Sequence, residues 1–220
     1  MVAAAFVLAN AYAHSQVAYT FFGGPQITYS YYKINDKKQK NTLKEGFQLG
    51  GGLKVPFEDQ LFFSPLSFYS LKGYKVSFDR ISVPPDSNAV NNNTTLHTFE
   101  LAPLLQVDLS KGSSHFFIRT GPSLDFQLFG KEKFSRTTSG PVNRNMKFGF
   151  ADYGHFAANW LLHFGYETEG GFVIFFQYTN GIASMNNADF GPRIFHRAAG
   201  ISIAYLFNKN KIVIYTRNKE

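Results

Sequence analysis

The chain has 220 residues, enough for one domain, and it contains no cysteine, which excludes a disulfide framework and thiolate metal sites. Its formal net charge is +7, a balance that attracts anionic lipid, lipopolysaccharide or nucleic acid. The basic residues are scattered through polar stretches and form no nucleic-acid-binding motif, so we expect no nucleic-acid partner.

An apolar run of small residues opens the chain at residues 2–13. It is too short for a membrane-spanning helix, which needs about 20 residues, but it is typical of the core of a secretory signal. Two small-x-small cleavage sites follow, Ala11-Tyr12-Ala13 and Ala13-His14-Ser15. No Lys or Arg precedes the run, and a first strand or a buried helix is the alternative. We predict a signal peptide over residues 1–16.

From residue 17 to residue 207 the chain alternates apolar and polar residues. Phe47 and Leu49 share one parity, for example, while Gln48 and Lys54 share the other. Side chains of a strand point to opposite faces with period 2, so each such segment predicts a strand with one apolar face. Eight strands are expected: 17–32, 45–56, 60–72, 96–109, 115–130, 147–167, 171–184 and 193–207.

The breaks between these strands alternate in length. The long ones are 33–44, 73–95 and 131–146, the short ones are 56–59, 110–114 and 167–171, and 185–192 is intermediate. Outer-membrane barrels have long extracellular loops and short periplasmic turns. The rhythm therefore favours a barrel in lipid over a soluble sandwich.

Ionisable residues on the polar parity support the same choice. In a sandwich core they would be buried at high cost, whereas in a barrel the apolar face meets lipid and the polar face fills the lumen. We therefore predict an all-β, eight-stranded antiparallel up-and-down transmembrane β-barrel over residues 17–207, located in the outer membrane. Its expected lumen polar network is Lys54, Glu100, Asp108, Arg119, Asp125, His155, His163 and Glu167.

A four-residue turn after the fourth strand would set the pairing inside the lumen. Gln106 then faces Arg119, and Asp108 lies diagonal to Arg119, which predicts an Arg119–Asp108 salt bridge. The same register places Glu100 opposite Asp125, so that one is protonated or a cation lies between them. An acid/base or metal site is one interpretation, and a polar core that rigidifies the barrel is the other, which we favour. No ligand spacing indicates a metal, and we expect no cofactor.

Three basic residues lie on the lipid-facing parity near the outer end: His97, Arg193 and Arg197. At that height they could contact lipopolysaccharide phosphates. The alternative is that they are loop residues already clear of the membrane.

Several segments resemble the small outer-membrane β-barrel family that includes the PorT-like proteins of Gram-negative bacteria, many of which carry type IX secretion. The matching segments are PLSFYSLKG (65–73), FELAPLL (99–105), GPSL (121–124), DYG (152–154) and GISIAYLF (200–207). The resemblance implies an outer-membrane barrel and supplies no catalytic residues.

Two features depart from that family. Its barrels usually finish on an aromatic residue, here Phe207, but this chain continues through a basic tail at 208–220, which we expect to be periplasmic. Leu66 and Phe68 also fall on the polar parity of their strand, which predicts a bulge or a locally packed lumen.

Three functions remain open. The first is a non-enzymatic structural or accessory subunit of a secretion or transport assembly in the cell envelope, with protein partners. The second is a surface barrel that recognises glycan, lipid or protein through its long loops. The third is a lipid-modifying enzyme. We expect the first, with outer-membrane lipid and lipopolysaccharide as further partners.

Overall fold

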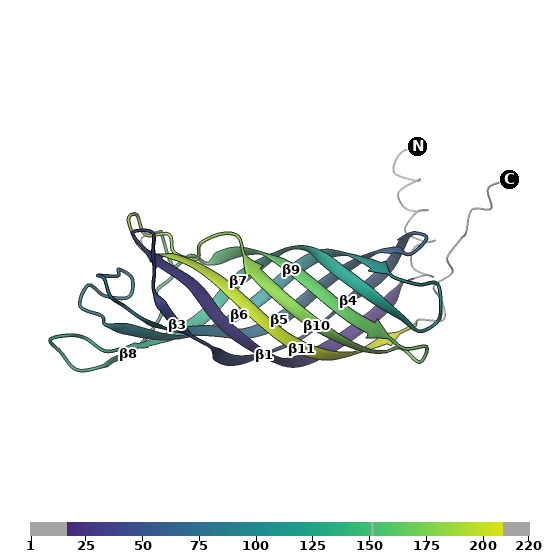
Figure 1. Ribbon diagram of the computed structural model, residues 1–220, viewed down its shortest axis with the longest axis horizontal. Helices are drawn as coiled ribbons and strands as arrows, with labels where there is room; N and C mark the ends of the chain where they lie inside the picture. Colours follow the sequence, from purple (N-terminus) through teal and green to yellow (C-terminus); the bar gives the residue numbers. More distant parts are fainter. Residues whose placement is uncertain (1–16, 151, 209–220) are drawn as a thin grey trace.

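The computed structural model describes residues 17–150 and 152–208. In this part of the chain, eight long antiparallel strands form one sheet, and β11 pairs with β1 to close it into a barrel (Figure 1). The predicted fold class is confirmed. The eight wall strands are β1 (Ala18–Ile34), β4 (Lys44–Glu58), β5 (Leu61–Ser77), β6 (Asn91–Asp108), β7 (His115–Phe134), β9 (Phe156–Glu167), β10 (Phe172–Gly181) and β11 (Arg193–Phe207).

Three short strands extend the wall at the end with the longer loops. β2 (Lys37–Lys38) pairs with β1, β3 (Lys40–Thr42) pairs with β5, and β8 (Val142–Asn145) pairs with β7. Much of each predicted long loop is therefore paired backbone. The extended pairing satisfies N–H and C=O groups that a free loop would leave to water.

The predicted strand at 147–167 is wrong over its first part. β9 begins only at Phe156, and the described residues before it form bends and isolated bridges. Their backbone pairs with the next loop instead: Gly154 N–H donates to the Met185 carbonyl at 2.7 Å, and Asn187 N–H donates to that of Asp152 at 3.0 Å. The alternating aromatic residues Phe148 and Phe150 imitate a strand, but their stretch folds as a loop.

The two faces of the wall divide as the alternation predicts. The outward face carries large apolar side chains that are exposed, such as Phe21 and Leu49, at 65% and 63%. The same face along the other strands continues this surface, for example at Phe63, Leu105, Leu128, Phe164, Phe176 and Ile203. In the described residues, no helix is long and apolar enough to cross a membrane.

The lumen contains an apolar layer as well as polar residues. Buried apolar side chains from every wall strand except β4 meet there, among them Phe22, Leu66, Phe68, Leu104, Phe117 and Phe175. β4 contributes glycines instead, since Gly50 pairs with Phe68 and Gly52 with Leu66. The alternative of a locally packed lumen at Leu66 and Phe68 is therefore the one observed.

The predicted signal peptide (1–16) lies outside the described residues, as does the predicted tail beyond residue 208. The first wall strand begins at Ala18 and the last ends at Phe207. β1 begins and β11 ends at the end of the barrel with the short turns, and the longer loops gather at the end where β3 and β8 are labelled (Figure 1).

Candidate functional site

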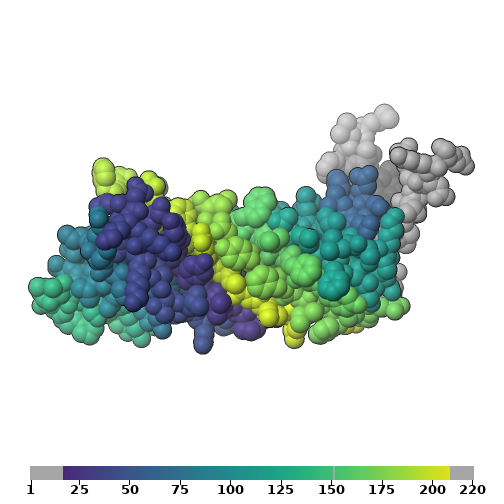
Figure 2. Space-filling model, in the orientation of Figure 1, coloured from purple at the N-terminus to yellow at the C-terminus, as the bar shows by residue number. Residues whose placement is uncertain are grey.

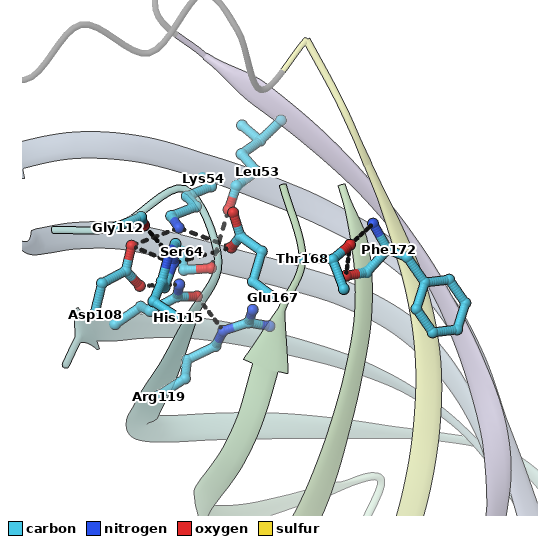
Figure 3. Close-up of polar contacts among 11 residues, drawn as sticks. Leu53, Lys54, Ser64, Asp108, Gly112, His115, Arg119, Glu167, Thr168 and Phe172 are labelled. Carbon is cyan, nitrogen blue, oxygen red and sulfur yellow. Dashed lines mark hydrogen bonds and ion pairs between the residues drawn. The ribbon is translucent and has the colours of Figure 1, made fainter. Parts of the chain in front are cut away.

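A buried ionic cluster occupies the lumen at the short-turn end (Figure 3). Lys54 Nζ lies 2.7 Å from Asp108 Oδ2 and 2.9 Å from Glu167 Oε2, and His115 Nε2 lies 2.9 Å from the same Asp108 oxygen. These side chains come from β4, β6, β9 and β7, and all are buried. One lysine thus bridges two carboxylates that approach from different strands. Sequence reasoning missed His115, the first residue of β7.

Arg119 joins this cluster indirectly. The predicted register is confirmed, because Gln106 pairs with Arg119. The predicted direct Arg119–Asp108 salt bridge is nevertheless wrong for the described residues. Arg119 Nε donates to Gln106 Oε1 at 3.0 Å, and Gln106 Nε2 donates to Asp108 Oδ1 at 2.7 Å. The amide of Gln106 therefore separates the two charges, while Lys54 and His115 contact the other oxygen of Asp108.

His163 is also buried in the lumen, as the parity of its strand predicts. It pairs across the β7–β9 ladder with Arg119, and its ring stacks on Phe175 with centroids 5.0 Å apart. It therefore lies between the ionic cluster and the apolar layer.

A second ionic cluster lies higher in the lumen. Glu100 pairs with Asp125, as predicted. The cation between them is Lys72 of β5, which forms ion pairs with Glu100 and, at 2.8 Å, with Asp125 Oδ2. Lys72 is 2% exposed. Sequence reasoning did not assign Lys72 to the lumen, although Lys72 is the last residue of the predicted strand 60–72 and has the same parity as the buried Phe68 and Ser70.

His155, which the sequence placed in the lumen network, does not lie there. Its side chain is exposed, and its ring contacts those of Phe148 and Phe156. The reason is the late start of β9: His155 precedes the strand, so the alternation that places Asn159 and His163 inside does not extend to it.

The apolar layer separates the two clusters. Along β6 the inward side chains run from Asp108 and Gln106 through Leu104 and Ala102 to Glu100. Within each cluster one lysine forms ion pairs with two carboxylates. With His115 the lower cluster joins four strands, and the upper cluster joins three. In the described residues, no group of three acidic or histidine side chains is arranged to hold a metal ion.

Polar contacts also order the loops at the outer end. Arg136 Nη2 lies 2.8 Å from Asp86 Oδ2, and the backbone N–H of Asn88 donates to Asp86 Oδ1 at 2.9 Å. The Asn88 N–H and the Arg136 guanidinium together lower the pKa of Asp86. Arg144 joins the loops a second time, through the Glu132 carboxylate at 2.7 Å and the Pro85 carbonyl at 2.6 Å.

The three outward basic residues do not form one site. His97 lies on β6, where its ring stacks on Phe129 with centroids 4.1 Å apart. Arg193 and Arg197 lie on β11, on the opposite side of the barrel in the strand order. Arg193 pairs with Asp36 at 3.6 Å, and the Arg197 guanidinium lies 5.1 Å from the centre of the Tyr31 ring.

Comparison with known proteins gives a family match. Residues 8–187 match the family described as outer membrane protein β-barrel domain. No curated protein matches the chain.

Three solved structures are similar at low identity. Ail, the attachment invasion locus protein of Yersinia pestis, is 12% identical, with 86% of this chain and 99% of that chain covered and a TM-score of 0.41.

The second is OprG of Pseudomonas aeruginosa, at 12% identity, 87% and 96% coverage and a TM-score of 0.45. The third, Neisserial surface protein A, has 8% identity, 84% and 96% coverage and a TM-score of 0.39.

Proposed function

The chain belongs to the outer membrane protein β-barrel domain family and is located in the outer membrane, and from that premise we propose that it is a non-enzymatic accessory subunit of a cell-envelope assembly. In this proposal the barrel is an anchor, and its outer loops hold a protein partner at the cell surface. The resemblance of its segments to PorT-like proteins supports a secretion or transport assembly as the setting.

The filled lumen supports an anchoring role. Two buried ionic clusters and an apolar layer follow one another along the barrel axis. An eight-stranded barrel is about wide enough for its side chains to fill, so the side chains of the described residues favour an anchor over a diffusion pore. The remaining surfaces available to a partner are the loops and the outer wall.

The observation that carries the proposal is the apolar character of the outer loops. Large apolar side chains from three separate connections are exposed there, including Ile81 at 71%, Phe150 at 98% and Phe190 at 104%. Exposed large apolar side chains at one end of the barrel supply contact area that a protein partner could bury. The backbone of Phe190 also has a φ of 59°, a conformation that a bulky residue rarely adopts, so Phe190 is unusual in its backbone as well as in its exposure.

The loops that carry these residues are already ordered. The Asp86–Arg136 ion pair and the Arg144–Pro85 hydrogen bond join the β5–β6 loop to the β7–β9 connection. An ordered loop loses less conformational entropy on binding. The arrangement therefore favours a preformed docking surface.

In vivo cross-linking tests this proposal. A photoreactive residue at position 190 should cross-link one specific envelope protein, and that protein should co-purify from native membranes in mild detergent. The Ile81→Ser/Phe190→Ser variant should lose it by weakening the apolar contact. Leu109→Ser, which makes the same change at the short-turn end, should retain it.

A wild-type barrel that purifies as a monomer, without a cross-linked partner, would contradict the proposal. Equal partner recovery from the double variant and the wild type would contradict the role of the loops. In the described residues, no observation favours the lipid-modifying alternative.

A further inference from the structure

Three cations surround one aromatic ring on the outer wall. Lys33 Nζ lies 5.2 Å, Lys38 Nζ 5.5 Å and the Arg197 guanidinium carbon 5.1 Å from the centre of the Tyr31 ring. They come from β1, β2 and β11. In Figure 2 the dark purple and blue segment of β1 to β3 lies beside yellow β11 on the face in view. The hairpin and the seam between β1 and β11 thus concentrate positive charge at one place.

This charge is not neutralised within the described part of the chain. The nearby carboxylate of Asp36 pairs with Arg193, and that of Asp79 pairs with Lys37. Neither pairs with Lys33, Lys38 or Arg197. Cation–π contact offsets only part of the mutual repulsion of three like charges. An anion bound among them would lower this repulsion.

Arg197 gives a second, independent indication. Its Nε–H is buried and has no acceptor among the described residues. A buried donor without a partner is costly, and most such groups in folded proteins are satisfied. Arg197 as a whole is only partly buried, and a guanidinium at a positive cluster is a typical partner of a phosphoryl oxygen.

An apolar groove continues from the cations along the same seam. Its volume is about 560 Å³. Tyr29 pairs with Arg197 and Ile27 pairs with Ala199, so the groove begins two residues below the guanidinium, toward the membrane centre. The carboxylate of Glu45 also lines it. The groove is also lined by Pro25, Ile27, Phe176, Ala199, Gly200 and Ile201.

We propose that this seam binds a phosphorylated glycolipid of the outer leaflet, of the lipid A class. Lys33, Lys38 and Arg197 contact a phosphoryl group, and one acyl chain lies in the groove below. The four residues from Tyr31 to Ile27 span about 13 Å along the strand, which separates the polar and apolar parts of such a lipid.

The lipid site is independent of the protein partner proposed above. It retains Arg197 from the residues that the sequence indicated for lipopolysaccharide. It leaves out His97, which lies on the opposite wall, and Arg193, whose charge is paired with Asp36. It adds Lys33 and Lys38, which only the hairpin brings to Tyr31.

Native mass spectrometry of the full chain in detergent tests the site. The probes are bisphosphorylated lipid A, the same lipid after dephosphorylation, and inorganic phosphate. The variant Lys33→Ala/Lys38→Ala/Arg197→Ala should bind lipid A at least tenfold more weakly than the wild type. Lys131→Ala/Lys133→Ala/Lys147→Ala removes the same charge elsewhere and should bind like the wild type.

Ala199→Phe tests the groove. Its larger side chain fills the position occupied by the acyl chain, so lipid A binding should weaken by several-fold. Resistance of each variant to unfolding by denaturant shows that the barrel remains folded.

Three results would overturn the proposal. The first is equal lipid A binding by the triple variant and the wild type. The second is equal binding of the dephosphorylated lipid, which would mean that the phosphoryl group is not recognised. The third is competition by inorganic phosphate at the same concentration as lipid A together with no effect of Ala199→Phe, which would indicate a free-phosphate site.

Discussion

Each lumen lysine lies between two carboxylates that come from other strands. Lys54 joins Asp108 and Glu167, and Lys72 joins Glu100 and Asp125. Buried charges of this kind are tolerated because each is paired; a bridge adds little stability over an apolar core, but removing one partner leaves the others uncompensated. The lysines are thus the residues on which the lumen electrostatics depend.

Replacing Lys72 tests this dependence. Lys72→Met leaves Glu100 and Asp125 facing one another without a cation, and we expect a loss of about 3–5 kcal/mol in the free energy of unfolding. Denaturant titration of the folded barrel in detergent micelles measures it. The control is Lys111→Met, which removes the exposed ion pair with Asp59 and should cost less than about 1 kcal/mol.

The carboxylates provide a further check on the same bridge. Adding Glu100→Gln and Asp125→Asn to Lys72→Met removes the uncompensated charges and should recover most of the loss. A Lys72→Met barrel as stable as the Lys111→Met control would show that the bridge does not neutralise the pair.

At the scale of elements, β4 and β5 fit together because β4 has glycine where β5 carries a large inward side chain. The inward side chains Leu66 and Phe68 of β5 face Gly52 and Gly50 of β4. The Phe68 ring then reaches Phe22, with centroids 5.6 Å apart. Glycine at these positions of β4 therefore makes room for the apolar layer that crosses the lumen.

A single methyl group on β4 should disturb this fit. A Cβ added at Gly50 would lie 2.2 Å from Phe68 Cβ, so Gly50→Ala should destabilise the barrel by about 1–3 kcal/mol through overpacking. The same denaturant titration measures it. Gly140→Ala is the control, because a Cβ there meets nothing within 4 Å. Equal stability of the two variants would contradict the close fit.

At the scale of the whole molecule, the barrel has a lipid-facing apolar wall, a filled interior and an ordered outer end. The outer-membrane location follows from the family, and the wall suits it because its exposed side chains are apolar. In the interior, every wall strand except β4 contributes apolar side chains to the layer that crosses the lumen. The filled interior therefore supports our proposal that the outer surface carries the function.

Conductance measurements test the closed interior. The wild-type barrel in a planar lipid bilayer should give no stable open-channel current, because the apolar layer and the ionic clusters fill the lumen. A porin of 16 to 18 strands, which encloses an aqueous channel, serves as the positive control under the same conditions. Steady current steps from the purified barrel, absent from a mock preparation, would contradict this prediction.

The amino-acid sequence by itself determined the number of wall strands, their alternating faces and the location of the protein in the outer membrane. These properties are local, because a period of two and the length of a break can be read within one segment. The same local information placed Glu100 opposite Asp125 and Gln106 opposite Arg119, since a short turn sets the register of its two strands.

Only the tertiary structure decided which charges meet. Lys54 and Glu167 come from strands far apart in the sequence, and Lys72 lies between Glu100 of β6 and Asp125 of β7, a contact that the pattern of its own strand does not reveal. His155 fell outside the lumen because β9 starts late, and the Tyr31 cation cluster formed because a hairpin folds back beside β11. Closure of the barrel sets the Lys54–Glu167 contact and the place of the hairpin beside β11, because closure brings together strands that are far apart along the chain.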